Sequence, residues 1–217
     1  MSRYYTSEKR QIPSAGRDIC LYIFRPTRNR KPRGQTPGIL WIHGGGYVTG
    51  MAKMIYISRA ISLVKKYGAV AVTPEYRLAG ESAGGGLTAA VCMYARDRGE
   101  ISIAFQMPLY PMLDDRDTDS SRDNRAPVWN TKRNHRGWKA YLGELYGKEV
   151  PPYAAPARQT DYTNLPPAYT FVGDIEPFYC ETLAYVEHLR RAGVPAKADV
   201  YPRCFHAFDM LLPCIIE

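Results

Sequence analysis

The chain carries Gly80-Glu81-Ser82-Ala83-Gly84 directly before an amphipathic run over residues 87–98. This G-x-S-x-G pattern is typical of a tight turn from a strand into a helix, which holds the serine hydroxyl toward a substrate. Alone the pattern is common, so its surroundings decide its meaning. A helix starting here would aim its N-terminus and the N–H of Ala83 at bound negative charge. The stretch predicts a nucleophilic Ser82; Glu81 either hydrogen-bonds near the site or is simply the variable position of the turn.

A second glycine-rich stretch, His43-Gly44-Gly45-Gly46-Tyr47, follows an apolar run over residues 38–42. Three glycines could form no more than a flexible turn. At the carboxyl end of a strand, where open α/β sheets bind ligands, glycine N–H groups can also approach a developing oxyanion closely. This position favours an oxyanion-binding loop.

A serine nucleophile needs a base, and the chain has four histidines. His43 belongs to the glycine loop, His135 lies in a basic stretch predicted as a loop, and His188 is predicted on a solvated helix face. His206 follows the last predicted strand, which gives the chain order serine, acid, histidine. His206 is therefore the predicted base; the alternative is a packed loop histidine.

Two carboxylates, Asp174 and Glu176, follow the strand predicted over residues 168–172. Either could accept a hydrogen bond from the imidazole and stabilise its charged form. Spacing leaves both open, because one of them could instead cap the helix predicted from Phe178.

Short apolar runs bounded by Gly or Pro predict buried strands, and helical periodicity fills the intervals between them. The expected strands cover residues 18–24, 38–42, 69–73, 103–107, 168–172 and 198–201, and the expected helices residues 56–67, 87–98 and 178–191. This alternation predicts a mostly parallel α/β sheet. We expect one domain over residues 1–217, with residues 114–164 as an excursion from the sheet.

Five stretches together resemble the hormone-sensitive-lipase-like family of α/β-hydrolases, in its acetyl-esterase branch: His43–Tyr47, Pro74–Ala79, Gly80–Gly86, Glu176–Pro177 and Phe205–Phe208. The resemblance implies the α/β-hydrolase fold with a small cap. It also implies hydrolysis of short-chain esters through an acyl-enzyme, with no cofactor and no metal.

The resemblance assigns roles to individual residues. Gly45, Gly46 and Ala83 match the donors of the oxyanion hole. The family often carries its acid in Asp-Pro-Leu, which Glu176-Pro177-Phe178 matches with Glu for Asp. Glu176 is thus the expected acid, with Asp174 in reserve.

Trp129 and Trp138 are expected substrate-binding residues, because the aromatic segment 114–164 could form a lid or acyl pocket, and Tyr47 at the end of the glycine loop is expected to bind substrate as well. Packing against the domain is the alternative for these rings. Two other functions stay open: a non-catalytic binding protein that keeps the pocket, and an amidase or peptidase with the same triad.

The composition is that of an ordinary globular chain, with 45% hydrophobic and 23% charged residues. The net charge of +8 is scattered over residues 25–33, 132–136 and 190–191, which read as a loop, a loop and a helix end. These stretches predict solvated faces and no nucleic-acid partner. No apolar run could span a membrane, and the N-terminus lacks an apolar signal segment.

Five cysteines without a close pair favour reduced thiols, so a cytoplasmic location is expected. The expected partner is a small-molecule ester; homodimer formation is left open.

One departure from the family lies between Ala79 and Gly80. A parallel strand must lead into the serine turn, and reaching it takes a crossover of a dozen or more residues. The sequence leaves no room for it. We expect about 30 residues, one crossover unit, to be absent here, with a strand-sized gap beside the strand at residues 69–73. The alternative is a true deletion that cripples the sheet.

Overall fold

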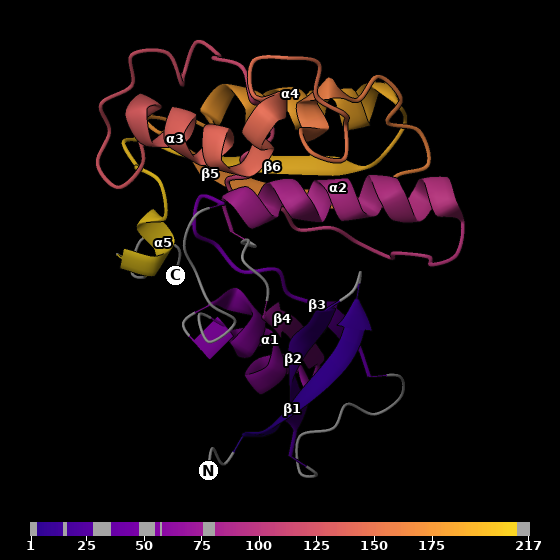
Figure 1. Cartoon of the computed structure of the whole chain (residues 1–217). Helices are drawn as coiled ribbons and strands as arrows, with labels where there is room; N and C mark the ends of the chain where they lie inside the picture. The colour runs from indigo at the N-terminus through magenta and orange to yellow at the C-terminus, as the bar shows by residue number, and fades with distance from the viewer. Residues whose placement is uncertain are drawn as a thin grey trace. The chain divides into compact units, whose positions relative to one another are not determined.

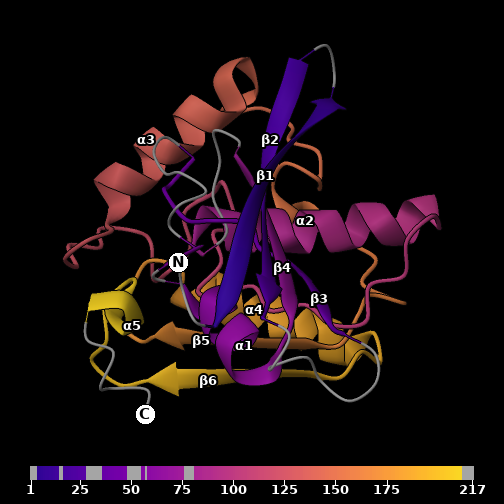
Figure 2. The same ribbon diagram turned by 90° about the horizontal axis from the view of Figure 1, so that it is seen from below.

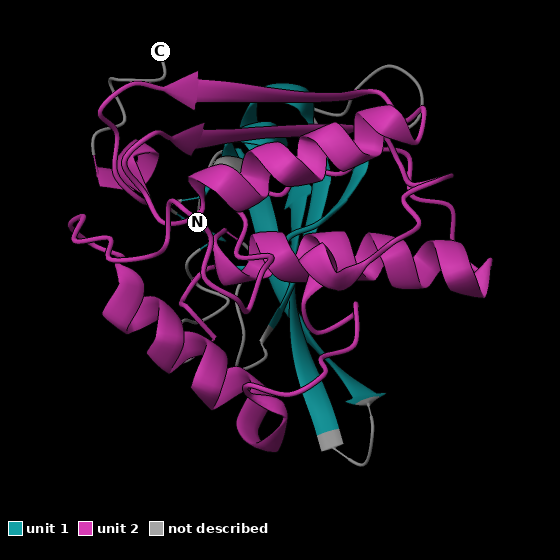
Figure 3. Ribbon diagram, turned by 90° about the horizontal axis from the view of Figure 1, so that it is seen from above, with its two compact units in different colours: residues 1–43, 50–77 teal, residues 44–49, 78–217 magenta. Residues whose placement is uncertain are grey.

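The computed structural model describes residues 4–14, 17–27, 36–47, 55–56, 58–75 and 81–211. The chain divides into two compact units (Figure 3): residues 1–43 and 50–77 form unit 1, and residues 44–49 and 78–217 form unit 2. The glycine loop at residues 45–47 and the predicted serine, acid and histidine all belong to unit 2. The single-domain organisation stays a prediction.

In the residues that the structure describes, unit 1 is a four-stranded sheet with one α-helix. Its elements are β1 (Tyr5–Ser14), β2 (Arg17–Pro26), β3 (Gly38–Leu40), α1 (Arg59–Tyr67) and β4 (Val70–Glu75), and the strand order is β1-β2-β4-β3. Figure 2 shows β1 and β2 as a long pair. The predicted helix and its stop are confirmed, since α1 ends at Gly68 in a left-handed conformation with φ 69°.

The expectation of a mostly parallel sheet is wrong for unit 1. β1 pairs antiparallel with β2, and β2 pairs antiparallel with β4, so only β3 and β4 run parallel. The two residues between β1 and β2 permit no other pairing, because parallel neighbours need a long crossover. β1 itself was not predicted, since its residues are largely polar and mostly exposed, without the apolar run that marks a buried strand.

Unit 2 consists of helices around a two-stranded parallel sheet. Its elements are α2 (Ala83–Arg98), α3 (Thr131–Leu142), η3 (Gly143–Leu145), η4 (Pro156–Arg158), β5 (Ala168–Gly173), α4 (Tyr179–Arg191), β6 (Ala196–Tyr201) and α5 (Phe208–Leu211). α4 connects β5 to β6 and runs along them, and α2 lies roughly parallel to α4 (Figures 1 and 3). The two helices meet in a core cluster that includes Met93 and Leu189.

The predicted strand at residues 103–107 is wrong. Among the described residues this segment forms one isolated bridge, from Gln106 to Ala168 at the start of β5. Gln106 is buried, donates to Pro166 O at 2.9 Å and accepts from the Tyr185 hydroxyl at 2.8 Å. The backbone of Gln106 forms this bridge, with Gln106 N donating to Pro167 O at 2.9 Å and Tyr169 N donating to Gln106 O at 3.1 Å, and its side-chain hydrogen bonds add to it.

The basic stretch 132–136 is also not a loop, because it lies in α3. Asn130 caps this helix by accepting a hydrogen bond from Arg133 N, and Trp138 and Leu142 bury its inner face. The basic residues occupy the exposed face of α3. The run of positive charge therefore suggested a loop, although the segment is helical. The helix end predicted at residues 190–191 is confirmed.

The junction between Ala79 and Gly80 lies outside the described residues. The expected position of the strand gap is wrong, since β4 pairs with β2 on one side and β3 on the other. In the part of unit 1 that the structure describes, β3 is the edge strand of the sheet, next to β4. Within the described ranges, no helix is long and apolar enough to cross a membrane.

Candidate active site

Ser82 stands at the predicted turn, immediately before α2. Its backbone has φ 67° and ψ −112°, a conformation that costs energy for any residue with a side chain. The turn is held on both sides: Ser82 N donates to Leu109 O at 3.1 Å, and Met112 N donates to Ser82 O at 2.9 Å. Strained residues of this kind persist where surrounding contacts fix them, often at functional sites.

The glycines after Ser82 are required by close packing. A Cβ on Gly85 would lie 2.8 Å from Pro111 Cβ, and one on Gly86 would lie 2.8 Å from Tyr47 Oη and overlap Met112 O. The first turn of α2 therefore approaches the chain at residues 109–112 more closely than any side chain would allow. The N–H of Ala83 at the first position of α2 has no acceptor within the helix, so it is available to a bound anion, whereas Gly84 N donates to Glu81 O at 3.3 Å.

Glu176 and His206 form a buried pair. Glu176 lies on the loop after β5 and is fully buried, and His206 lies on the loop after β6 and is 4% exposed. Glu176 Oε1 accepts from Gly173 N at 3.0 Å, while Oε2 is hydrogen-bonded to His206 Nδ1. This arrangement leaves His206 Nε2 as the nitrogen available for chemistry.

Asp174 is occupied elsewhere. Its side chain accepts a hydrogen bond from Arg203 N at 2.6 Å, and the residue is exposed. Of the two carboxylates that the sequence left open, the structure brings Glu176 and not Asp174 to the histidine.

Aromatic rings surround His206. The centroids of Tyr110, Phe178 and Trp129 lie 4.9, 5.0 and 6.2 Å from that of its imidazole. Tyr110 is buried and donates its hydroxyl to Asp209 Oδ1 at 2.9 Å. Burial, followed by the charges of Glu81 and Asp209, raises the pKa of Tyr110 well above its usual range.

Tyr110 and Asp209 were not found by sequence reasoning. No motif marks Tyr110. Asp209 follows His206 by three residues. This spacing indicates that the two residues lie near each other, but it does not indicate what Asp209 does.

The expected substrate-binding residues occupy different environments. Trp129 is half-buried beside His206, whereas Tyr47 and Trp138 are buried together in a core cluster. Tyr47 donates its hydroxyl to Met112 O at 3.3 Å. Substrate contact stays a prediction for all three, and the 1% exposure of Trp138 favours packing.

One hydrogen bond of the predicted Ser82–His206–Glu176 triad is not present in the described part of the structure. Among the residues that the structure describes, no hydrogen bond joins the Ser82 hydroxyl to His206. Catalytic hydrogen bonds in ligand-free enzymes are often long and tighten when substrate binds.

Comparison with known proteins places the chain in a family. Residues 78–210 match the family model described as alpha/beta hydrolase fold. The chain belongs to this family. Residues 2–80 match the carboxylesterase family, and the two matches meet at residues 78–80, where the sequence lacks a crossover. The expected α/β-hydrolase fold and the resemblance to hormone-sensitive-lipase-like esterases are confirmed.

Its relatives include several esterases. Esterase LipI of Mycobacterium tuberculosis is 27% identical over 214 residues, which cover 81% of this chain and 67% of LipI. The acetyl-hydrolase of Streptomyces hygroscopicus is 29% identical over 143 residues, covering 64% of this chain and 47% of that protein. The chain thus spans about half to two thirds of these curated relatives.

Solved structures cover more of the chain. The structure named Bacterial Heroin Esterase superimposes with a TM-score of 0.89 at 28% identity, covering 97% of this chain and 80% of that one. The hyperthermophilic esterase of Pyrobaculum calidifontis gives a TM-score of 0.84 at 26% identity, covering 96% and 79%.

Proposed function

We propose that the protein hydrolyses esters of short carboxylic acids through an acyl-enzyme formed on Ser82. One observation carries the proposal: Glu176 and His206 form a buried hydrogen-bonded pair in the same unit as a serine at a strained turn. A buried carboxylate on Nδ1 fixes the tautomer in which Nε2 can accept a proton. That is the state a general base needs.

In the proposed reaction Ser82 Oγ attacks the ester carbonyl carbon while His206 Nε2 takes the hydroxyl proton. Glu176 stabilises the imidazolium that results. When the tetrahedral intermediate collapses, His206 returns the proton to the leaving alcohol, and the acyl group stays on Ser82. Water then attacks the acyl-enzyme with His206 as base, which releases the acid and restores the serine.

The N–H groups of Gly45, Gly46 and Ala83 are the proposed donors to the oxyanion. Removing one such donor costs about 3 kcal/mol of barrier in enzymes of this type. Support for Ala83 comes from its place at the first position of α2, where no intrahelical acceptor exists.

The test is hydrolysis of p-nitrophenyl esters from acetate to decanoate by the wild type and Ser82→Ala. We expect activity to peak among the short esters and kcat to fall about 10⁴-fold or more in the variant, because the nucleophile is lost. Ser62→Ala, on the exposed face of α1, is the matched control and should retain activity. Equal rates for wild type and Ser82→Ala at every chain length would refute the proposal.

A second candidate is a non-catalytic binding protein that keeps the hydrolase site. A genuine deletion of the crossover between Ala79 and Gly80 would favour this function, because Ser82 would then lack the strand that positions it. Saturable binding of an ester without turnover would identify this function. Hydrolysis of p-nitroanilides faster than the matching esters would instead identify an amidase or peptidase.

We also propose a cytoplasmic location and a small-molecule ester as partner. Cys20, Cys92, Cys180 and Cys204 are free, and burial raises the pKa of the Cys92 thiol to about 12. Free thiols are typical of a reducing compartment. Homodimer formation stays a prediction, to be tested by light scattering.

A further inference from the structure

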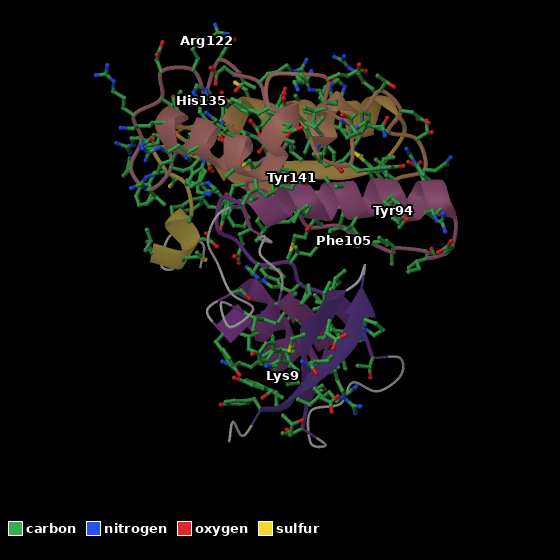
Figure 4. The ribbon with its side chains drawn as sticks, in the orientation of Figure 1. Lys9, Tyr94, Phe105, Arg122, His135 and Tyr141 are labelled. Atoms are coloured by element: carbon green, nitrogen blue, oxygen red, sulfur yellow. The ribbon has the colours of Figure 1, made fainter. Side chains whose placement is uncertain are left out.

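Helix α3 contacts the glycine loop along its inner face. A Cβ on Gly137 of α3 would lie 2.8 Å from Gly46 O, which is a backbone atom and cannot move aside alone. One turn further along α3, the ring of Tyr141 stacks on Tyr47 with centroids 4.0 Å apart and planes 9° apart. Trp138 contacts the same tyrosine at 5.2 Å. Figure 4 labels Tyr141 on this helix.

Trp129 covers the loop from a second direction. A Cβ on Gly46 would lie 2.7 Å from Trp129 Cζ3 and overlap the adjoining ring carbon. Gly46 also has φ 58°, a conformation that side chains disfavour. The indole N–H of Trp129 donates to Asn134 Oδ1 at 3.4 Å, and Asn134 is buried in α3. The Gly46 peptide is thus enclosed between the indole and the α3 backbone.

We propose that Trp129 and Gly137 are positioning residues that hold the Gly46 peptide in the orientation needed for the oxyanion hole. The inference rests on the proposed function and gives the excursion at residues 114–164 a different role from a lid. Preorganised donors stabilise a transition state only when their geometry is held before the reaction begins. A displacement of about 1 Å at such a site can cost about 10²-fold in rate.

Gly137→Ala tests the inference, because Ala stabilises helices relative to Gly while the new methyl must displace Gly46 O. We expect kcat for p-nitrophenyl butyrate to fall at least tenfold and KM to stay within about twofold, while the melting temperature falls only modestly, because the gain in helix propensity offsets part of the overpacking cost. Affinity for a trifluoromethyl ketone, which forms a tetrahedral adduct on serine, should fall by the same factor as kcat/KM. Arg136→Ala, on the exposed face of α3, is the control and should change none of these.

Trp129→Phe is the second variant, in case Gly137→Ala folds poorly. The smaller ring vacates the space over Gly46, so kcat should fall with KM little changed. The effects of the two substitutions should be non-additive, because both contact the same peptide and Trp129 Cζ2 lies 3.4 Å from the Gly137 Cβ position. Strict additivity in this double-mutant cycle would contradict the inference.

The outcomes separate the inference from the proposed function. If the wild type cleaves esters and Gly137→Ala retains its kcat and its ketone affinity, the inference alone is wrong. The inference is also wrong if Gly137→Ala loses activity only because less of it is folded. In that case its melting temperature falls, and the folded molecules bind the trifluoromethyl ketone as tightly as the wild type does. A wild type that neither cleaves esters nor reacts with a fluorophosphonate at Ser82 overturns both.

Discussion

The two halves of the candidate site have unequal support from the chain around them. Glu176 and His206 follow β5 and β6, which pair in parallel over their full length. Ser82 follows β4 by only a few residues, too few for the crossover that a parallel strand before it would need. Within unit 2 the serine is held instead by Leu109 O and Met112 N. The acid–base half thus rests on regular structure, and the nucleophile half on a turn and its neighbours.

The largest expected effect concerns the junction between Ala79 and Gly80. We expect the polypeptide isolated from its natural source to carry a crossover helix and strand there. Its intact mass should then exceed 24.5 kDa by about 3 kDa, since a crossover unit has about 30 residues. Peptide mapping across the junction should find no tryptic peptide in which Ala79 is bonded to Gly80.

A measured mass of 24.5 kDa together with that junction peptide would refute this expectation. The contrast between the two halves would then be a property of the protein itself. That result would favour the non-catalytic binding function over ester hydrolysis.

The next effect concerns the two carboxylates of the better-supported half. Glu176→Gln keeps the shape of the side chain but removes the charge that stabilises the His206 imidazolium, so kcat should fall about 10³- to 10⁴-fold. Asp174→Asn should cost less than about tenfold, because Asp174 only accepts from Arg203 N. Steady-state kinetics on p-nitrophenyl butyrate measures both, and the reverse order of losses would assign the acid to Asp174.

Close glycine packing allows the two halves to be compared directly. A Cβ on Gly173 would lie 2.6 Å from Cys204 C near the histidine loop, and one on Gly86 would overlap Met112 O near the serine. Each Gly→Ala change should destabilise the fold by about 1–3 kcal/mol through overpacking. Urea unfolding measures the loss, with Gly38→Ala as control, since nothing lies within 4 Å of its Cβ position. A loss at Gly173 alone would show that the serine turn yields more readily than the histidine loop.

The same contrast explains what the sequence could predict of the fold. The strands now seen as β5 and β6, and the helix between them, were predicted because apolar runs, Gly and Pro stops and helical periodicity coincide there. β1 and α3 were missed, since β1 is mostly exposed and polar and the outer face of α3 is basic. The apolar run at residues 103–107 predicted a strand, but among the described residues this segment forms only the isolated bridge at Gln106, and Ala104 and Phe105 are exposed.

Of the candidate site, the turn at Ser82 and the placement of His206 after a strand were open to prediction. The choice between Glu176 and Asp174 was not, because both follow the same strand and only the path of the His206 loop separates them. The contacts of Trp129 and Gly137 with Gly46 depend on a helix that the sequence did not reveal.

A pH-dependent effect is expected at Glu181 of α4, whose carboxyl contacts the backbone just after Met112. Its Oε1 accepts from Leu113 N at 2.5 Å and Asp114 N at 3.2 Å, just beyond the segment that holds Ser82. Its Oε2 is buried without a hydrogen-bond partner among the described residues. Burial raises the pKa of this carboxyl well above its usual range, so the folded protein retains a proton that the unfolded chain releases.

Stability should therefore decline as the pH rises above the ordinary carboxyl pKa of 4.5, at most by about 1.4 kcal/mol per pH unit, because the unfolded state binds fewer protons. Glu181→Gln keeps an oxygen to accept from Leu113 N and cannot titrate. In urea unfolding, the variant should become more stable relative to the wild type as the pH rises above 4.5. Glu187→Gln, on the exposed face of α4, is the control and should follow the wild type. Parallel stability curves for wild type and Glu181→Gln would contradict this expectation. They would mean that Glu181 is a charged carboxylate in the folded protein and accepts from Leu113 N and Asp114 N in that form.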